Sequence, residues 1–140
     1  MMDAPWVMEA AKLAVLLAVV LAVAWLVRRI GLGRDARIRD DAHAIALADD
    51  YSVGFGGVEV GRDRAGYAAL VRNAAGEQIL VRAHGNFFAA RRIGHDFSGR
   101  LDKDFLTLIP AEKTFGAVTL HLGKDAGVWA SRMRDIVKAS

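Results

Sequence analysis

The sequence lacks cysteine and has only two prolines in 140 residues. Without cysteine, the chain can form no disulfide, no thiolate metal site and no cysteine nucleophile. The four histidines are also dispersed, because no two of them are closer than eleven residues. Histidines that bind a metal together usually lie a few residues apart on one element, so the spacing predicts no metal site. These histidines are His43, His84, His95 and His121.

Patterns typical of catalysis or phosphate binding are missing as well. The glycines between Gly54 and Gly57 are not followed by the lysine and Ser or Thr of a phosphate-binding loop. His95, Asp96 and Ser98 are triad residue types, but neighbours in one polar loop cannot adopt the geometry of nucleophile, base and orienting acid. We therefore expect no enzymatic activity and no cofactor. An enzyme with an unrecognised site is the alternative, and it would need a pocket with converging polar groups.

The strongest positive signal is the apolar run from Leu13 to Val27, which contains no charged residue. As a helix this run is only about 22 Å long, whereas the hydrocarbon core of a bilayer is about 30 Å thick. Starting the helix at Pro5 removes the shortfall, because proline suits the first turn of a helix. Trp6 and Trp25 then lie about 28 Å apart, as expected of two interfacial anchors. The sequence predicts a transmembrane helix over residues 5–28.

Two charged residues near the start of this span, Glu9 and Lys12, are three positions apart and can pair on one helix face. A cleaved signal peptide is an alternative, with Ala22-Val23-Ala24 as the small-residue site. Its acidic first residues and the arginines directly after that site argue against cleavage. A buried helix of a soluble protein is a further alternative, but a chain of this size has no core large enough to surround it.

Positive charge is concentrated directly after the apolar run. The arginines of this segment are Arg28, Arg29, Arg34, Arg37 and Arg39. By the positive-inside rule the C-terminal part is cytoplasmic and a short N-terminal tail lies outside, which fits a prokaryotic inner membrane. We assign Arg28 and Arg29 to the membrane anchor with the two tryptophans. Arg34, Arg37 and Arg39 are predicted to contact anionic lipid headgroups, unless they serve only to fix the topology.

The remainder of the chain is electrically balanced. From Asp40 onward, the sequence has thirteen basic and thirteen acidic side chains. A nucleic-acid-binding domain would carry a basic surplus on its own surface, so nucleic acid is not an expected partner.

Small residues recur every fourth position within the apolar run. They are Ala10, Ala14, Ala18 and Ala22. Such spacing lets two membrane helices approach closely, so this alanine stripe is a candidate surface for helix pairing. The alternative is that the stripe only reflects an alanine-rich composition.

The composition divides the chain into a transmembrane anchor (1–30), a basic juxtamembrane linker with a short helix (31–50) and a β-rich cytoplasmic domain (51–140). Gly31-Leu32-Gly33 is a candidate hinge. From Tyr51 the apolar pattern alternates, which indicates six or seven short strands. Their predicted ranges are 51–60 with a glycine bulge at 56–57, 66–72, 78–83, 87–93, 104–109 and 116–122, with a polar loop at 94–99. Residues 66–72 and 78–83 form the clearest hairpin.

Helical spacing returns after Gly123, where Asp125 can cap a helix. Trp129, Met133 and Ile136 then share one face with Val137. Strands followed by this helix, and the segment FGAVTLHLGKDAGVWASRMRDIV in particular, resemble a pleckstrin-homology-like domain. The resemblance implies an α+β fold, with a small antiparallel β-barrel or bent sheet closed by the C-terminal helix. It also implies that Trp129 is a packing residue.

In that family, phosphoinositides approach the first turn between strands. This sequence has Arg62, Asp63 and Arg64 there and no lysine, so we transfer the architecture and not the ligand.

A possible partner surface lies at residues 87–92. Phe87 and Phe88 are adjacent in a predicted strand, so one of them must point away from the core. We select Phe88, Arg91 and Arg92 as this surface, with a solvated strand end neutralised by nearby aspartates as the alternative. The sequence as a whole predicts a single-pass, non-catalytic interaction or scaffolding module with a protein partner. A small accessory subunit of an inner-membrane complex, held through its helix, is the second interpretation.

Overall fold

The computed structural model describes residues 5–29 and 36–139. The chain divides into two compact units, Met1–Arg34 and Asp35–Ser140.

The described part of the first unit is the helix α1 (Pro5–Arg29), which confirms the predicted helix and extends it by one residue. Its 25 residues would measure about 37 Å along the axis. No residue of α1 is buried, and Lys12 Nζ lies 3.3 Å from Glu9 Oε1, as predicted. α1 is therefore long and apolar enough to span a membrane, a property that it shares with signal sequences.

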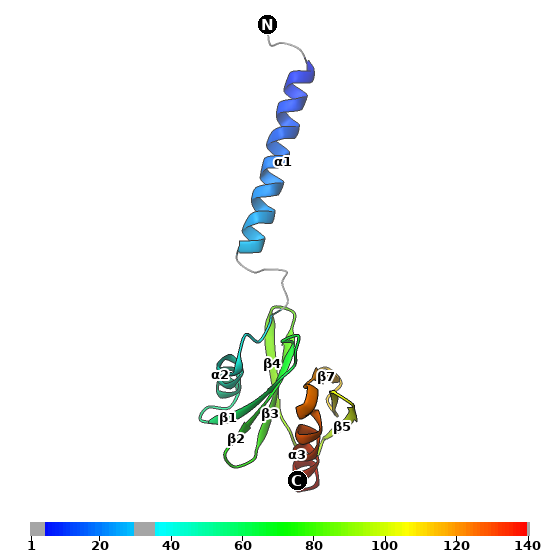
Figure 1. Ribbon diagram of the computed structural model, residues 1–140. Helices are drawn as coiled ribbons and strands as arrows, with labels where there is room; N and C mark the ends of the chain where they lie inside the picture. Colours follow the sequence, from blue (N-terminus) through cyan, green and yellow to red (C-terminus); the bar gives the residue numbers. More distant parts are fainter. Residues whose placement is uncertain (1–4, 30–35, 140) are drawn as a thin grey trace. The chain divides into compact units, whose positions relative to one another are not determined.

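The second unit is α+β (Figure 1). Its elements are α2 (Asp41–Tyr51), β1 (Gly57–Arg62), β2 (Ala68–Asn73), β3 (Gln78–His84), β4 (Phe87–Arg92), β5 (Phe97–Asp102), β6 (Phe105–Pro110), β7 (Val118–His121), the short 3₁₀ turn η1 (Gly123–Asp125) and α3 (Ala126–Ala139).

The seven strands form two antiparallel sheets, one in the order β1-β2-β3-β4 and one in the order β5-β6-β7. The predicted hairpin is present as β2 and β3, with Leu70 opposite Leu80. Asn73 closes its turn, because the side-chain oxygen of Asn73 accepts the backbone N–H of Glu77 at 2.9 Å. Across the described residues the two sheets stay separate and form no closed barrel.

Two element predictions need correction. Tyr51 was assigned to a strand but is the last residue of α2, and β1 starts only at Gly57. The predicted bulge at the glycines is present, since the β1–β2 register shifts between Gly57 and Glu59. Residues 94–99 were predicted to be a loop, yet β5 begins at Phe97, whose buried ring anchors the strand in the core.

Helix α2 is part of the folded unit, although we assigned residues 31–50 to a linker. Asp40 caps its start, because Asp40 Oδ1 accepts the backbone N–H of His43 at 2.7 Å. The helix begins after Arg39, so its first turn contains Asp41 and no basic residue. The basic residues Arg37 and Arg39 therefore lie before the helix and do not oppose its dipole. Residues 30–35, including the glycine hinge, lie outside the described residues.

Alternation along β2 and β3 supplies two hydrophobic cores, one on each face of the first sheet. Val71 and Val81 face α2, whose Ala44 and Ala48 are completely buried against the sheet. Leu70 and Leu80 belong to the other core, to which the second sheet and α3 also contribute. Figure 1 shows α2 on one side of β1–β4 and α3 with β5–β7 on the other. This arrangement explains why most residues of β2 and β3 are buried, whichever face of the sheet they lie on.

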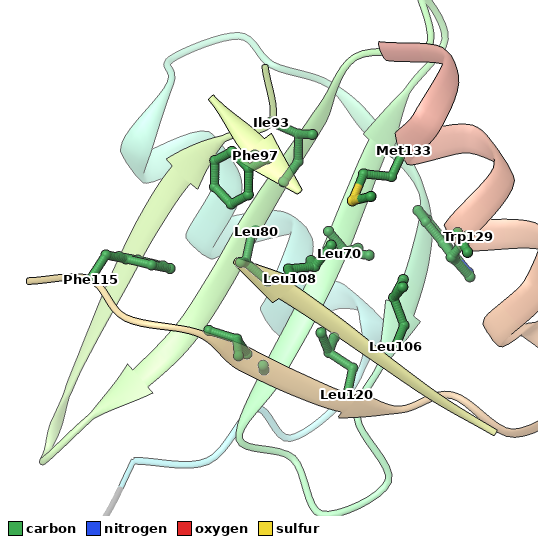
Figure 2. Close-up of a cluster of buried hydrophobic side chains, with 13 residues drawn as sticks. Leu70, Leu80, Ile93, Phe97, Leu106, Leu108, Phe115, Leu120, Trp129 and Met133 are labelled. Atoms are coloured by element: carbon green, nitrogen blue, oxygen red, sulfur yellow. The ribbon is translucent and has the colours of Figure 1, made fainter. Parts of the chain in front are cut away.

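Helix α3 is fixed by two large side chains, as its predicted apolar face requires (Figure 2). Trp129 is only 3% exposed and lies against Gly61 of β1, where an added Cβ would be 2.7 Å from the indole ring. Met133 lies against Gly99 of β5, where an added Cβ would be 2.2 Å from Met133 Cε. Arg132 beside them forms an ion pair with Glu59. Because α3 contacts a strand from each sheet through glycine, it approaches both backbones closely.

Candidate functional site

The residues assigned to the membrane anchor lie at the two ends of α1. Trp6 and Trp25 are 72% and 60% exposed, so neither is used for packing within the unit. The guanidinium of Arg29 lies 5.2 Å from the centre of the Trp25 ring, within the range of a cation–π contact. Arg28 precedes it and is exposed.

The alanine stripe is exposed along its whole length. Ala10, Ala14, Ala18 and Ala22 all lie on the surface of α1. Leucines and valines occupy much of the rest of the helix, so these small side chains leave a shallow strip along it.

The three arginines assigned to headgroups differ in their surroundings. Arg34 lies outside the described residues. Arg37 is engaged with the domain, since Nη1 donates to the carbonyl of Ala65 at 3.1 Å and the guanidinium stacks 3.9 Å from the centre of the Tyr67 ring. The side chain of Arg39 is exposed. Its contact with Arg62 is made by the backbone, where the Arg39 carbonyl oxygen accepts a hydrogen bond from the Arg62 guanidinium. Of the two that can be described, Arg39 has the freer side chain.

The turn between β1 and β2 also uses its charged side chains for contacts within the domain. Arg62 Nε donates to Asp41 Oδ1 at 2.8 Å, which joins the end of β1 to the start of α2. Asp63 is buried, and its Oδ1 accepts the backbone N–H of His121 at 2.8 Å. This turn therefore fastens the first sheet to β7.

At the predicted partner surface, the two phenylalanines have the opposite roles to those we assigned. Phe88 is half-buried in the core under α2, with its ring 5.4 Å from the His43 ring in an edge-on contact. Phe87 is 71% exposed and is the aromatic side chain that faces solvent. The alternation along β4 was correct, but the sequence alone did not show that α2 covers the Phe88 side.

Arg91 is bound within the domain. Its Nε and Nη2 donate to the two carboxylate oxygens of Glu112 at 2.7 and 3.0 Å, which joins β4 to the loop after β6. These hydrogen bonds lower the pKa of the Glu112 carboxyl and raise the pKa of Arg91. The neutralising carboxylate is thus Glu112, and not one of the aspartates at 96, 102 and 104 that the sequence suggested.

Arg92 points to the α2 side of β4. It forms an ion pair with Glu77, and its Nη2 donates to Ser52 Oγ at 3.0 Å. Arg91 and Arg92 are therefore both paired, and neither offers an uncompensated charge to a partner.

The sequence did not reveal a groove between α2 and β4, which has a volume of about 420 Å³. Leu47, Asp50 and Tyr51 line its α2 side. Phe87 and Phe88 lie on its β4 side. Leu47 and Tyr51 gave an apolar signal, but we assigned Leu47 to a linker and Tyr51 to a strand, so the two were not recognised as one helix face.

A second cavity, of about 310 Å³, lies where the two sheets separate. Arg82 of β3 lines it together with Tyr67 and Thr119. Arg82 Nη1 donates to the carbonyl of Phe115 at 2.6 Å, and among the described residues no carboxylate lies within ion-pair distance of this guanidinium. Chemically, this arrangement suits a small anion.

In the described part of the chain, no group of three or more histidine, aspartate or glutamate side chains could hold a metal ion. Comparisons with models of protein families, with curated proteins and with solved structures find no match.

Proposed function

We propose that the protein is a membrane-anchored, non-catalytic interaction module. In this proposal α1 crosses the inner membrane with its N-terminus outside, and the α+β unit docks a protein partner on the cytoplasmic side. One observation carries the proposal: a helix with no buried residue is joined to a compact unit that has two cores of its own. An apolar helix that a domain does not need for packing is what a membrane anchor requires.

We further propose that the α+β unit is pleckstrin-homology-like. A four-stranded sheet, a three-stranded sheet and a C-terminal helix with a buried central tryptophan follow one another in the expected order. The proposal concerns architecture only.

The orientation can be tested with protease. Spheroplasts should protect the domain from added protease, and digestion should begin only after the inner membrane is permeabilised. Digestion of the domain in intact spheroplasts, or recovery of the full-length chain outside the membrane fraction, would contradict this topology.

Partner docking can be tested by comparing the full chain in mild detergent with a fragment of residues 36–140. The fragment begins at 36 because α2 belongs to the core of the domain. If the domain docks the partner, the full chain and the 36–140 fragment should each co-purify with the same partner protein.

The alternative, an accessory subunit held by its helix, is favoured by the exposed alanine stripe. In that case the 36–140 fragment would lose the partner, and so would Ala14→Leu/Ala18→Leu in the full chain, because the larger side chains keep the helices apart. Val20→Leu/Val23→Leu adds bulk to the opposite face of α1 and is the matched control.

A further inference from the structure

The groove between α2 and β4 borders a strand edge that is open. Among the described strands, β4 pairs with β3 alone. Ile93 N–H donates to the carbonyl of Gln78, and bonding residues alternate along an antiparallel pair. The register therefore directs the backbone N–H and C=O groups of Phe88 and Ala90 away from β3. Among the described residues, no backbone group bonds them on that side, and only Arg91 Nη1 reaches the carbonyl of Ala90, at 2.7 Å.

The uncompensated charge at this groove is negative. Asp50 is exposed, and no cation in the described part of the chain pairs with it. The last turn of α2 has no basic residue, so the negative end of the helix dipole adds to the Asp50 charge. The nearby cations Arg91 and Arg92 are already neutralised by their own glutamates.

The rest of the lining is apolar or aromatic. Leu47 and Tyr51 form the α2 wall, and Val81 with the β4 residues completes the opposite side. Main-chain donors and acceptors that have no backbone partner in the described part of the chain, next to such a wall, are what an added strand requires, because the main chain supplies hydrogen bonds while alternate side chains enter the groove.

We propose that this groove binds an extended segment of a partner protein, which pairs with β4 as an additional strand and places a lysine or arginine beside Asp50. The inference rests on the proposed function and assigns the docking site. A second copy of this chain fits less well, because its β4 would bring arginines that are already paired.

The test uses the full-length protein in phosphatidylcholine nanodiscs and a labelled ten-residue peptide of alternating valine and threonine with one central lysine. A second peptide has glutamate in place of the lysine, and a third is N-methylated at alternate residues. The lysine peptide should bind about fivefold more tightly than the glutamate peptide, as one exposed ion pair allows. N-methylation should weaken binding about tenfold or more, because it removes several main-chain hydrogen bonds.

Asp50→Lys should reverse the preference between the lysine and glutamate peptides. Asp135→Lys makes the same change of charge on exposed α3 and should leave the preference unchanged. In hydrogen exchange, the amides of Phe88 and Ala90 should gain protection when the lysine peptide binds. Equal affinity for the N-methylated peptide, or protection elsewhere without protection of these two amides, would overturn the proposal. So would a concentration-dependent dimer that protects the same amides without peptide.

The two proposals can fail separately. If Asp50→Lys still co-purifies with the partner that the wild-type domain binds, the groove is not the docking site and the proposed function stands. If the wild-type domain binds the lysine peptide as expected but co-purifies with no protein, the groove proposal is supported and the proposed docking of a protein partner is contradicted.

Discussion

At the scale of single residues, the contact between Trp129 and Gly61 leaves no room for an added side chain. Gly61→Ala would place a methyl group 2.7 Å from a buried indole ring that cannot move without shifting α3. We expect a loss of about 1–3 kcal/mol in the free energy of unfolding. Gly127→Ala, also at α3 but with open space around it, should be neutral or stabilise by up to about 1 kcal/mol. Urea unfolding of residues 36–140, followed by the fluorescence of Trp129, measures both, and equal stability of the two variants would contradict the expectation.

At Gln78, by contrast, we expect a substitution to raise the free energy of unfolding. Its side chain is completely buried, and neither its amide oxygen nor its nitrogen has a hydrogen-bond partner in the described part of the chain. Gln78→Met removes these polar atoms at similar volume and should raise the free energy of unfolding by about 1–3 kcal/mol. Asn73→Leu is the contrasting variant and should destabilise, because Asn73 bonds Glu77 through both side-chain atoms. A lower free energy of unfolding for Gln78→Met would contradict this expectation and would show that the Gln78 side-chain amide is hydrogen-bonded in the folded protein.

The Arg91–Glu112 pair makes stability depend on pH in acid. The pKa of Glu112 is lowered in the folded state. The pair therefore stabilises the folded domain at any pH above the ordinary pKa of glutamate. This contribution is lost as the pH falls through the lowered pKa of Glu112. Glu112→Gln should therefore be less stable than wild type near neutral pH and should lose less stability on acidification. Urea unfolding across the acid range tests this, and parallel curves would show that the pair contributes no pH dependence.

At the scale of elements, α2 depends on its cap. Asp40→Ala removes the acceptor for the His43 N–H and should destabilise the domain by about 1 kcal/mol. Asp40→Asn keeps an oxygen acceptor and should recover most of this loss. Chemical unfolding of the 36–140 fragment provides the measurement, and an unaffected Asp40→Ala would mean that tertiary packing alone sets the start of α2.

The elements that could be predicted from the sequence are those with strong local signals. α1 follows from its apolar length, the β2–β3 hairpin from alternation around a turn, and α3 from its apolar face. Tyr51 was misassigned because alternating apolar residues continue past the end of an alanine-rich helix. The groove was missed because Ala44 and Ala48 carry no strong signal, although their small size lets α2 lie close on the sheet. Glu112 is 21 residues from Arg91, so sequence proximity could not identify that pair.

At the scale of the whole molecule, the domain should be thermodynamically independent of the helix. No residue of α1 is buried, and among the residues that the structure describes, both cores are formed by Ile38 and residues after it. We expect the 36–140 fragment and the full chain in nanodiscs to unfold at the same urea concentration, monitored by hydrogen exchange of β2 and β3. A higher midpoint for the full chain would mean that the anchor or the bilayer stabilises the domain.

The position of α3 after all seven strands has a consequence for biosynthesis. Trp129 and Met133 complete the core between the sheets, yet the ribosome makes them only after β7. At a synthesis rate of about 5–20 residues per second, the ribosome completes α3 roughly one to four seconds after it completes β7. During this interval the nascent chain exposes apolar surface, so chaperones have their main opportunity to bind it before α3 arrives.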